Sequence, residues 1–153
     1  MVKTSIPDLI KNSKIALNLD VSDEKDALLK LIKLLELGET KENLLYNSVL
    51  QREEMGSTGI GNGIAIPHTR SFVVTDMMIA IGRLKKPINF NSVDGKPVSL
   101  IFLIVAPPYA YHSDYLIFLG KIAEIFQESS INDKLFKIEG DENFKEELCK
   151  LFF

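Results

Sequence analysis

One apolar segment carries the strongest structural signal in this sequence. It reads Val98-Ser99-Leu100-Ile101-Phe102-Leu103-Ile104-Val105, and Ser99 is its only polar residue. A run this uniform is typical of a strand that lies inside a sheet and is covered on both faces. It is far shorter than the ~20 apolar residues that a membrane-spanning helix requires. We therefore expect a central β-strand at residues 98–105.

Shorter extended segments and amphipathic helices lie on either side of this strand in the chain. Further strands are predicted at Lys14–Leu19, Ile64–Ile66 and Met77–Leu84. Helices are predicted from a cap at Ser22 to just before Gly38, from Thr40 to Glu54, from Ser113 or Asp114 to Glu128, and near Asn132–Ile138 and Glu142–Phe152. This order favours an α/β fold, a three-layer α/β/α sandwich around a mixed parallel and antiparallel sheet of about four to five strands. No linker divides residues 1–153, so we expect a single domain.

The composition excludes several classes of function. The chain has a net charge of −3 and no cluster of Lys and Arg, which disfavours a nucleic-acid partner. Cys149 is its only cysteine, and it has two histidines, so a disulfide is excluded and a structural zinc site is disfavoured. The first residues lack the apolar core of a signal peptide. We expect a cytoplasmic protein that does not insert into a membrane and needs no metal or cofactor.

A second segment carries the candidate chemistry. It reads Gly59-Ile60-Gly61-Asn62-Gly63-Ile64-Ala65-Ile66-Pro67-His68 and ends on one of the two histidines. Pro67 fixes its own φ and biases Ile66 towards extended geometry, while the glycines allow a close backbone approach. This pattern predicts a rigid imidazole next to backbone amides that can bind an anion. The alternative is a histidine that only closes a strand. The spacing of the glycines fits neither a dinucleotide loop nor a P-loop.

Arg52 lies sixteen residues before this histidine, at the predicted end of a helix. We interpret it as a guanidinium that folds over a phosphoryl group, for which its planar pair of donors is suited. The alternative is a surface arginine paired with a glutamate. Ser57 and Thr58 either donate to the same phosphoryl oxygens or are simply turn residues.

Residues Glu53 to His68 resemble the phosphohistidine motif of enzyme IIA domains of the bacterial phosphoenolpyruvate-dependent phosphotransferase system, fructose–mannitol class. The motif has an acidic or amide residue first (Glu53), then an apolar and a small residue (Ile60-Gly61), and closes on apolar-Ala-apolar-Pro-His (Ile64 to His68). Within this class the segment Ser57–His68 is most similar to the nitrogen-regulatory branch. The later stretches 87–90, 93–98 and 100–107 fit the same branch, so the resemblance covers nearly the whole chain, as one IIA domain.

The resemblance implies a phosphocarrier. His68 would accept a phosphoryl group on Nε2 from the phosphorylated histidine-containing phosphocarrier protein, and Arg52 would stabilise that group. Two positions depart from the family pattern. Thr69 replaces a small residue and either narrows the donor's approach or adds a hydroxyl to the phosphoryl site. Tyr115 stands where the family has a second histidine, and His112, three residues upstream, is the other candidate for that place.

Three hypotheses remain open about what the protein does downstream of His68. The preferred hypothesis is a regulatory protein whose effect on a target depends on the phosphorylation of His68. The second is the IIA component of a fructose- or mannitol-type sugar transporter, which passes the phosphoryl group to a IIB domain. The third is a protein-binding module that keeps the fold and is not phosphorylated, a hypothesis prompted by Thr69 and Tyr115.

Overall fold

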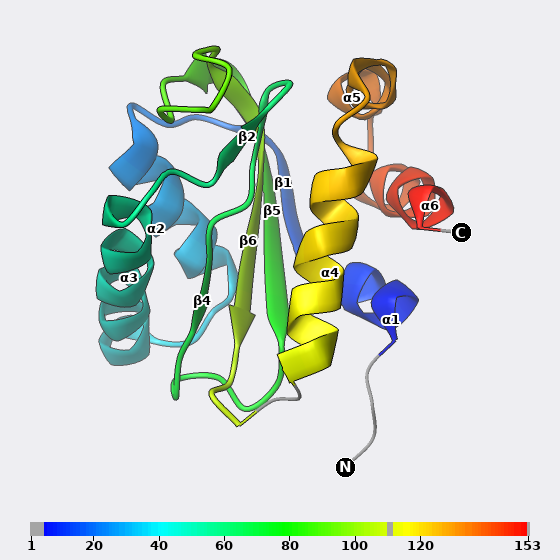
Figure 1. Ribbon diagram of the computed structural model, residues 1–153. Helices are drawn as coiled ribbons and strands as arrows, with labels where there is room; N and C mark the ends of the chain where they lie inside the picture. The colour runs from blue at the N-terminus through cyan, green and yellow to red at the C-terminus, as the bar shows by residue number, and fades with distance from the viewer. Residues whose placement is uncertain (1–4, 110–111, 153) are drawn as a thin grey trace.

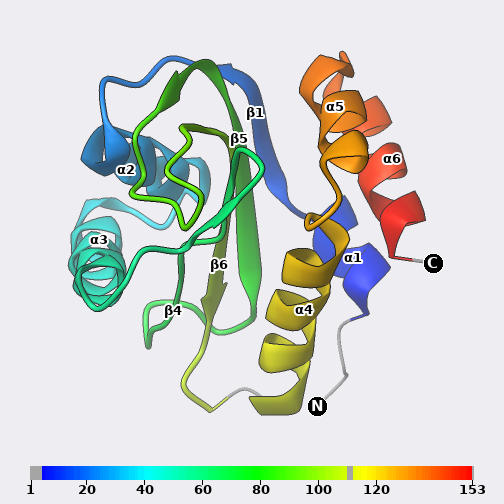
Figure 2. The ribbon, with the colours of Figure 1, turned by 45° about the horizontal axis from the view of Figure 1, so that its top comes forward.

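The computed structural model describes residues 5–109 and 112–152, except for the side chains of residues 112–114 and 129–132. Figures 1 and 2 show the arrangement of its helices and strands. In chain order the elements are α1 (Ile6–Lys11), β1 (Lys14–Leu19), α2 (Glu24–Leu34), α3 (Glu39–Glu54), β2 (Gly59–Gly61), β3 (Ile64–Ala65), β4 (His68–Arg70), β5 (Met78–Ile88), β6 (Val98–Ala106), α4 (His112–Ile125), α5 (Ser129–Lys137) and α6 (Asp141–Leu151).

The sheet is mixed, as the sequence predicts. Its strand order is β1-β5-β6-β3-β2, and β4 pairs with β6 as well. β1 is parallel to β5, β5 is antiparallel to β6, and both β3 and β4 are parallel to β6. The sheet has six strands, slightly more than expected. The two unpredicted strands, β2 and β4, have three residues each, too few to show a hydrophobic period.

Helices cover both faces of the sheet, with α2 and α3 on one face and α1, α4, α5 and α6 on the other (Figures 1 and 2). Along β6, Leu100, Phe102 and Ile104 pack in the core next to α4 and α6. Ile101, Leu103 and Val105 pack in the second core, next to α2 and α3. The three-layer sandwich and the doubly covered central strand are thus confirmed. Among the described residues, no helix has both the length and the apolar character needed to cross a bilayer.

Helix boundaries differ from the predicted ones where capping decides them. The Asp23 carboxylate, and not Ser22, caps α2 by accepting the Asp26 N–H at 2.8 Å. The Asp26 carboxylate accepts the Ser22 N–H at 2.9 Å, so each aspartate accepts one backbone N–H at the N-terminus of α2. The short helix α1, which follows an N-cap at Ser5, was not predicted. The predicted helix near residues 132–138 is α5, which begins earlier.

Gly59 lies so close to Ser92 that the chain has no room for a side chain there. A Cβ at Gly59 would be 2.9 Å from the Ser92 Cα, and backbone cannot move aside cheaply. We expect Gly59→Ala to lower the free energy of unfolding, measured in urea, by about 1–3 kcal/mol. Gly120 is the matched control, because nothing lies within 4 Å of a Cβ placed there in α4. Gly120→Ala should leave stability unchanged or raise it by up to about 1 kcal/mol. Equal stability of the two variants would contradict this account of Gly59.

Candidate functional site

An interruption in the strand next to β6 presents His68. β3 pairs with the first half of β6 and β4 with the second half, on the same side of it. The break between them is Ile66-Pro67, where proline has no N–H for the ladder. The Pro67 carbonyl still accepts from the Ile104 N–H at 3.0 Å, and the Ile66 N–H donates to Thr58 at 3.0 Å. His68 is therefore the first residue of a new strand segment, fixed by hydrogen bonds on both sides of the break.

The same break sets the tautomer of the imidazole. The His68 Nδ1 lies 2.8 Å from the Ile66 carbonyl oxygen. A carbonyl oxygen only accepts, so Nδ1 carries the hydrogen and donates it. The neutral ring then has an unprotonated Nε2, the form in which a histidine acts as a nucleophile. The acceptor of the Nδ1 hydrogen is the Ile66 carbonyl, two residues earlier in the chain.

The charges of Arg52 and Glu53, at the C-terminal end of α3, shift the pKa of His68 in opposite directions. Burial lowers the pKa of His68 below its ordinary value, and the Arg52 guanidinium lowers it further. The Ile66 hydrogen bond and the Glu53 carboxylate act in the opposite direction. Arg52 also donates from Nη1 to the Gly56 carbonyl at 3.0 Å, which folds its side chain back over the end of the helix. The neutral, nucleophilic form of the ring is thus favoured.

Two residues that the sequence placed at the site use their hydroxyls inside the protein. The Ser57 hydroxyl donates to the Phe90 carbonyl, and its oxygen accepts the Gly59 N–H at 3.0 Å. Thr58 is buried and donates both its hydroxyl and its N–H to Glu53. These bonds favour the interpretation of Ser57 and Thr58 as turn residues. They also give Glu53 a role that the sequence did not reveal, since it ties the loop to the end of α3.

Thr69 lies on the opposite face of β4 from His68, so the strand geometry does not support its predicted role at the phosphoryl site. It pairs with Val105, whose side chain packs against α2 and α3, whereas His68 pairs with Ile104 on the α4 side. Successive side chains of a strand point to opposite faces, so Thr69 and His68 are separated by the sheet. The His112 side chain lies outside the described residues, so its candidacy for the second histidine's place stays a prediction.

Tyr115, on α4, does lie beside His68. The two ring centroids are 6.1 Å apart and the ring planes meet at 61°, an edge-to-face arrangement. Burial raises the pKa of Tyr115 to about 12, and the two nearby guanidinium groups only partly oppose this. The phenol is therefore neutral at pH 7. Arg70 lies against the Tyr115 ring, with its Cζ 4.6 Å from the ring centroid. Sequence reasoning missed Arg70 because it did not predict β4, in which residues 68 and 70 share a face.

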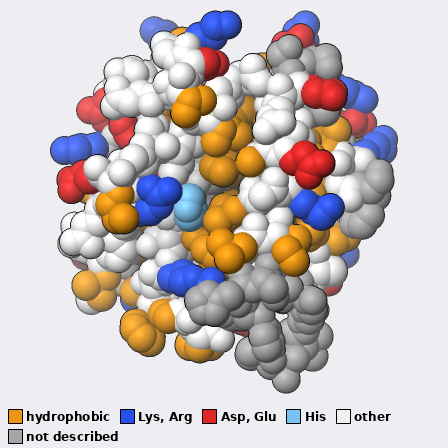
Figure 3. Space-filling view, in the orientation of Figure 1, with side chains coloured by type: hydrophobic (Ala, Val, Ile, Leu, Met, Phe, Trp, Pro, Cys, Tyr) orange, Lys and Arg blue, Asp and Glu red, His pale blue; other side chains and the backbone are white. Residues whose placement is uncertain are grey.

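The surface around the histidine is partly charged and partly apolar. Figure 3 shows the histidine side chain near the middle of one face, with Lys or Arg side chains beside and below it. Hydrophobic side chains line the other side of the same shallow depression (Figure 3). An exposed imidazole edge between cations and an apolar surface suits a protein partner that brings an anionic group. Within the described part of the chain, no group of three His, Cys, Asp or Glu side chains could hold a metal ion.

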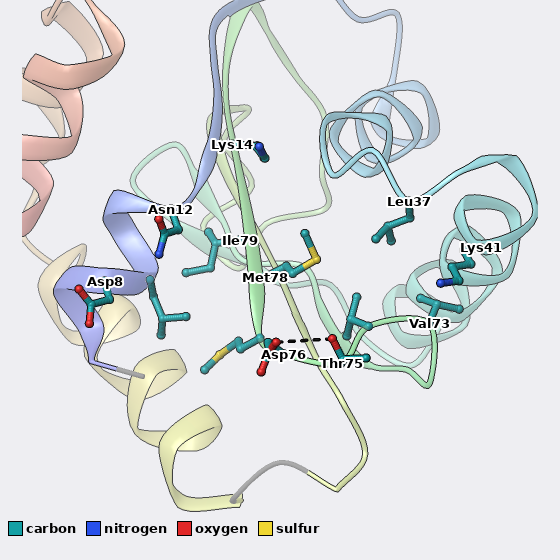
Figure 4. Close-up of a pocket in the computed structure, with 13 residues that line it drawn as sticks. Asp8, Asn12, Lys14, Leu37, Lys41, Val73, Thr75, Asp76, Met78 and Ile79 are labelled. Carbon is teal, nitrogen blue, oxygen red and sulfur yellow. Dashed lines mark hydrogen bonds between the residues drawn. The ribbon is translucent and has the colours of Figure 1, made fainter. Parts of the chain in front are cut away.

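A separate groove does not involve the predicted site residues. It has a volume of about 830 Å³ and lies between α1, the start of β1 and the loop that leads into β5. Figure 4 shows its lining, in which Asp8 and Asp76 are balanced by Lys14 and Lys41. The groove offers neither a nucleophile nor a clear charge preference.

The lowered pKa of His68 gives a measurable expectation. In a pH titration followed by NMR, the His68 ring should protonate below the ordinary value of 6.5, because burial and Arg52 disfavour its charged form. Arg52→Gln should raise the midpoint, since it removes a positive neighbour. By linkage, the contribution of the neutral ring to stability is complete above pH 6.5 and declines as the pH falls from 6.5 towards the lower folded-state pKa. A midpoint at or above 6.5 would contradict this description of the site.

Comparison with known proteins gives a consistent result. Residues 8–150 match the protein family described as phosphoenolpyruvate-dependent sugar phosphotransferase system, EIIA 2. The nitrogen regulatory protein of Bradyrhizobium diazoefficiens is 38% identical over 131 residues, which are 85% of this chain and 85% of that protein. The fructose-specific EIIABC component of the PTS system of Bacillus subtilis is 30% identical over 139 residues, 90% of this chain and 22% of that protein.

Solved structures match this chain over almost its full length, and one of them is a nitrogen regulatory protein. The crystal structure of the nitrogen regulatory protein IIA-Ntr from Neisseria meningitidis has a TM-score of 0.84 with this chain. The two are 32% identical, and the match covers 94% of this chain and 98% of the other. The mixed sheet and its helical layers are therefore those of a known fold.

Proposed function

The chain belongs to the EIIA 2 family of the phosphoenolpyruvate-dependent sugar phosphotransferase system, and on that premise we propose that it is a phosphocarrier that works through His68. The proposed donor is the phosphorylated histidine-containing phosphocarrier protein, and the proposed location is the cytoplasm. The proposed output is regulatory, and its support is the 38% identity with a nitrogen regulatory protein.

One observation carries the proposal. The Nδ1 hydrogen of His68 is donated to the Ile66 carbonyl at 2.8 Å, which leaves Nε2 as the only unprotonated ring nitrogen. The lowered pKa keeps the ring in this form at neutral pH. A histidine that served only to close a strand would need neither a defined tautomer nor a nearby guanidinium.

The transfer step follows from this geometry. The Nε2 lone pair of His68 forms a bond to phosphorus as the bond from phosphorus to the donor's ring nitrogen breaks, and that nitrogen keeps the bonding pair. Positive charge develops on the His68 ring, and the hydrogen bond from Nδ1 to Ile66 strengthens accordingly. The transferring group carries negative charge in a loose, in-line transition state, which Arg52 is placed to stabilise. The protein therefore contributes position and charge to this step.

A role as the IIA component of a sugar transporter is the second candidate function, and it has separate support. The 30% identity with the fructose-specific EIIABC component favours a transfer onward to a IIB domain, as in sugar transport. The chemistry at His68 would be the same, so the site does not discriminate between the two outputs. Incubation of the phosphorylated protein with a fructose- or mannitol-type IIB domain separates them. Rapid loss of the phosphoryl group to IIB would favour the transporter component, and retention favours the regulatory protein.

Phosphorylation itself is tested first. The protein is incubated with enzyme I, the phosphocarrier protein and phosphoenolpyruvate, and the modified residue is mapped by mass spectrometry. We expect one phosphoryl group per chain on His68. If the intact protein takes up no phosphoryl group, the proposal fails, and the protein-binding module without phosphorylation becomes the better description.

A further inference from the structure

The Tyr115 ring lies between two residues that alternate along one strand. It meets the His68 ring edge-to-face, and the Arg70 guanidinium lies over it at 4.6 Å from its centroid. Arg70 also donates from Nη1 to the Pro107 carbonyl at 3.3 Å. A buried aromatic ring with a guanidinium over its face is a favourable cation–π arrangement. The contact therefore fixes where the positive charge of Arg70 is held while His68 carries no phosphoryl group.

The position of Arg70 in β4 puts its charge within reach of a group on His68. Residues 68 and 70 pair with Ile104 and Ala106, which belong to the same core on the α4 side. Two residues apart in a strand, their Cα atoms are about 6.6 Å from each other. A guanidinium at the end of an arginine side chain can span such a distance. A phosphoryl group on Nε2 would extend from the side of the ring opposite the Nδ1–Ile66 hydrogen bond.

Both arginines act on the site before phosphorylation. The Arg52 guanidinium lowers the pKa of both His68 and Tyr115, and the Arg70 guanidinium lowers that of Tyr115. The Arg70 guanidinium lies over the Tyr115 ring, which in turn meets the His68 ring edge-to-face. A dianionic phosphoryl group offers a guanidinium two charge-assisted hydrogen bonds, which are stronger than its contact with a neutral ring. The arrival of the phosphoryl group therefore gives Arg70 a better partner than Tyr115.

We propose that Arg70 is a second cationic ligand of the phosphoryl group on His68, and that Tyr115 is the positioning residue that holds Arg70 beside the site until the phosphoryl group arrives. This inference rests on the proposed function and adds a residue to it. Its further consequence is that phosphorylation releases the face of the Tyr115 ring and alters the contact of Arg70 with the Pro107 loop. The surface next to His68 then differs between the two states by more than the added charge.

The first test needs no variant. The Nε–Hε signal of Arg70 is followed by NMR in the intact protein before and after phosphorylation, with assignment by comparison with Arg70→Lys. We expect a clear shift of this signal on phosphorylation, because the guanidinium leaves an aromatic ring and binds an anion. Tyr115→Leu should shift the same signal in the unphosphorylated protein, which a purely structural role of the tyrosine would not require. If the chemical shift of the Arg70 Nε–Hε signal does not change on phosphorylation, the proposal is overturned.

The second test measures the equilibrium of phosphoryl transfer between the phosphocarrier protein and this protein. An equilibrium does not depend on how fast the partners dock, so it reports the binding of the phosphoryl group alone. We expect Arg70→Gln to shift the equilibrium towards the phosphocarrier by about tenfold, and Arg70→Lys by less. Lys33→Gln, which removes one exposed charge from α2, should leave it unchanged.

The outcomes separate the two proposals. If the wild-type protein is labelled on His68 and Arg70→Gln has the same equilibrium, only the role of Arg70 is overturned. If the wild-type protein takes no label, the phosphocarrier proposal fails as well. Thermal unfolding of each variant shows whether it is folded, and the NMR shift in the wild-type protein decides the case even if Arg70→Gln does not fold.

Discussion

We expect His68→Ala to abolish phosphorylation by enzyme I, the phosphocarrier protein and phosphoenolpyruvate. The expected loss is complete, because His68 is the proposed nucleophile, with its Nδ1 hydrogen donated to a backbone carbonyl and its Nε2 unprotonated. The measurement is the mass of the intact protein after incubation, followed by mapping of the modified residue. The fold should survive, since His68 is only partly buried and lies at the edge of its core.

The matched control is His112→Ala, which leaves the same number of histidines as His68→Ala. It should still carry a phosphoryl group on residue 68. A variant lacking His68 that is labelled to the wild-type extent, on His112 or elsewhere, would contradict the assignment of the nucleophile. Circular dichroism of both variants excludes a trivial loss through unfolding.

Arg52→Gln should slow phosphorylation by about 10²–10³-fold, the usual cost of removing one preorganised donor from a developing negative charge. The physical reason is that Arg52 is the cation that acts on the His68 ring itself in the unphosphorylated site. The measurement is the initial rate of labelling at low concentrations of the phosphocarrier protein. Arg52→Lys should recover part of the rate, because lysine keeps the charge but lacks the planar pair of donors.

Loss of the Arg52 bond to the Gly56 carbonyl could by itself disturb the loop that follows α3. Thermal unfolding and the NMR signals of Thr58 and Gly59 report on this loop independently of the rate. Lys33→Gln serves as the charge control on α2. A rate for Arg52→Gln within twofold of the wild type, in a folded protein, would contradict the role given to this guanidinium.

The sequence predicted the elements whose signal is long and periodic. The apolar run at 98–105 identified β6, and helical spacing with a glycine stop identified α3 almost to the residue. The strands that the sequence did not predict, β2 and β4, have only three residues each. β2 forms because it pairs antiparallel with β3. β4 forms because the Ile66-Pro67 break divides the strand next to β6, and β6 pairs with both parts. Pairing of this kind is a tertiary effect that no local pattern encodes.

At the site, the motif predicted which residues lie together better than it predicted what the neighbouring loop residues contact. His68, Arg52 and Tyr115 are brought together around one depression. The polar loop residues were harder to interpret, because a hydroxyl next to a site can face it or close a turn, and only the structure shows that Ser57 and Thr58 bond inwards. Thr69 and Arg70 could have been distinguished from the alternation of a strand, had β4 been predicted.

The central claim is that Nε2 of His68 is the phosphorylated atom, because Nδ1 is bound to the Ile66 carbonyl. The most direct test is long-range ¹H–¹⁵N NMR of the ¹⁵N-labelled protein, before and after phosphorylation, with detection of coupling to ³¹P. The account predicts a neutral ring with its hydrogen on Nδ1 before the reaction, and phosphorus coupled to Nε2 of His68 afterwards. Phosphorus on Nδ1, on His112 or on no histidine would contradict it.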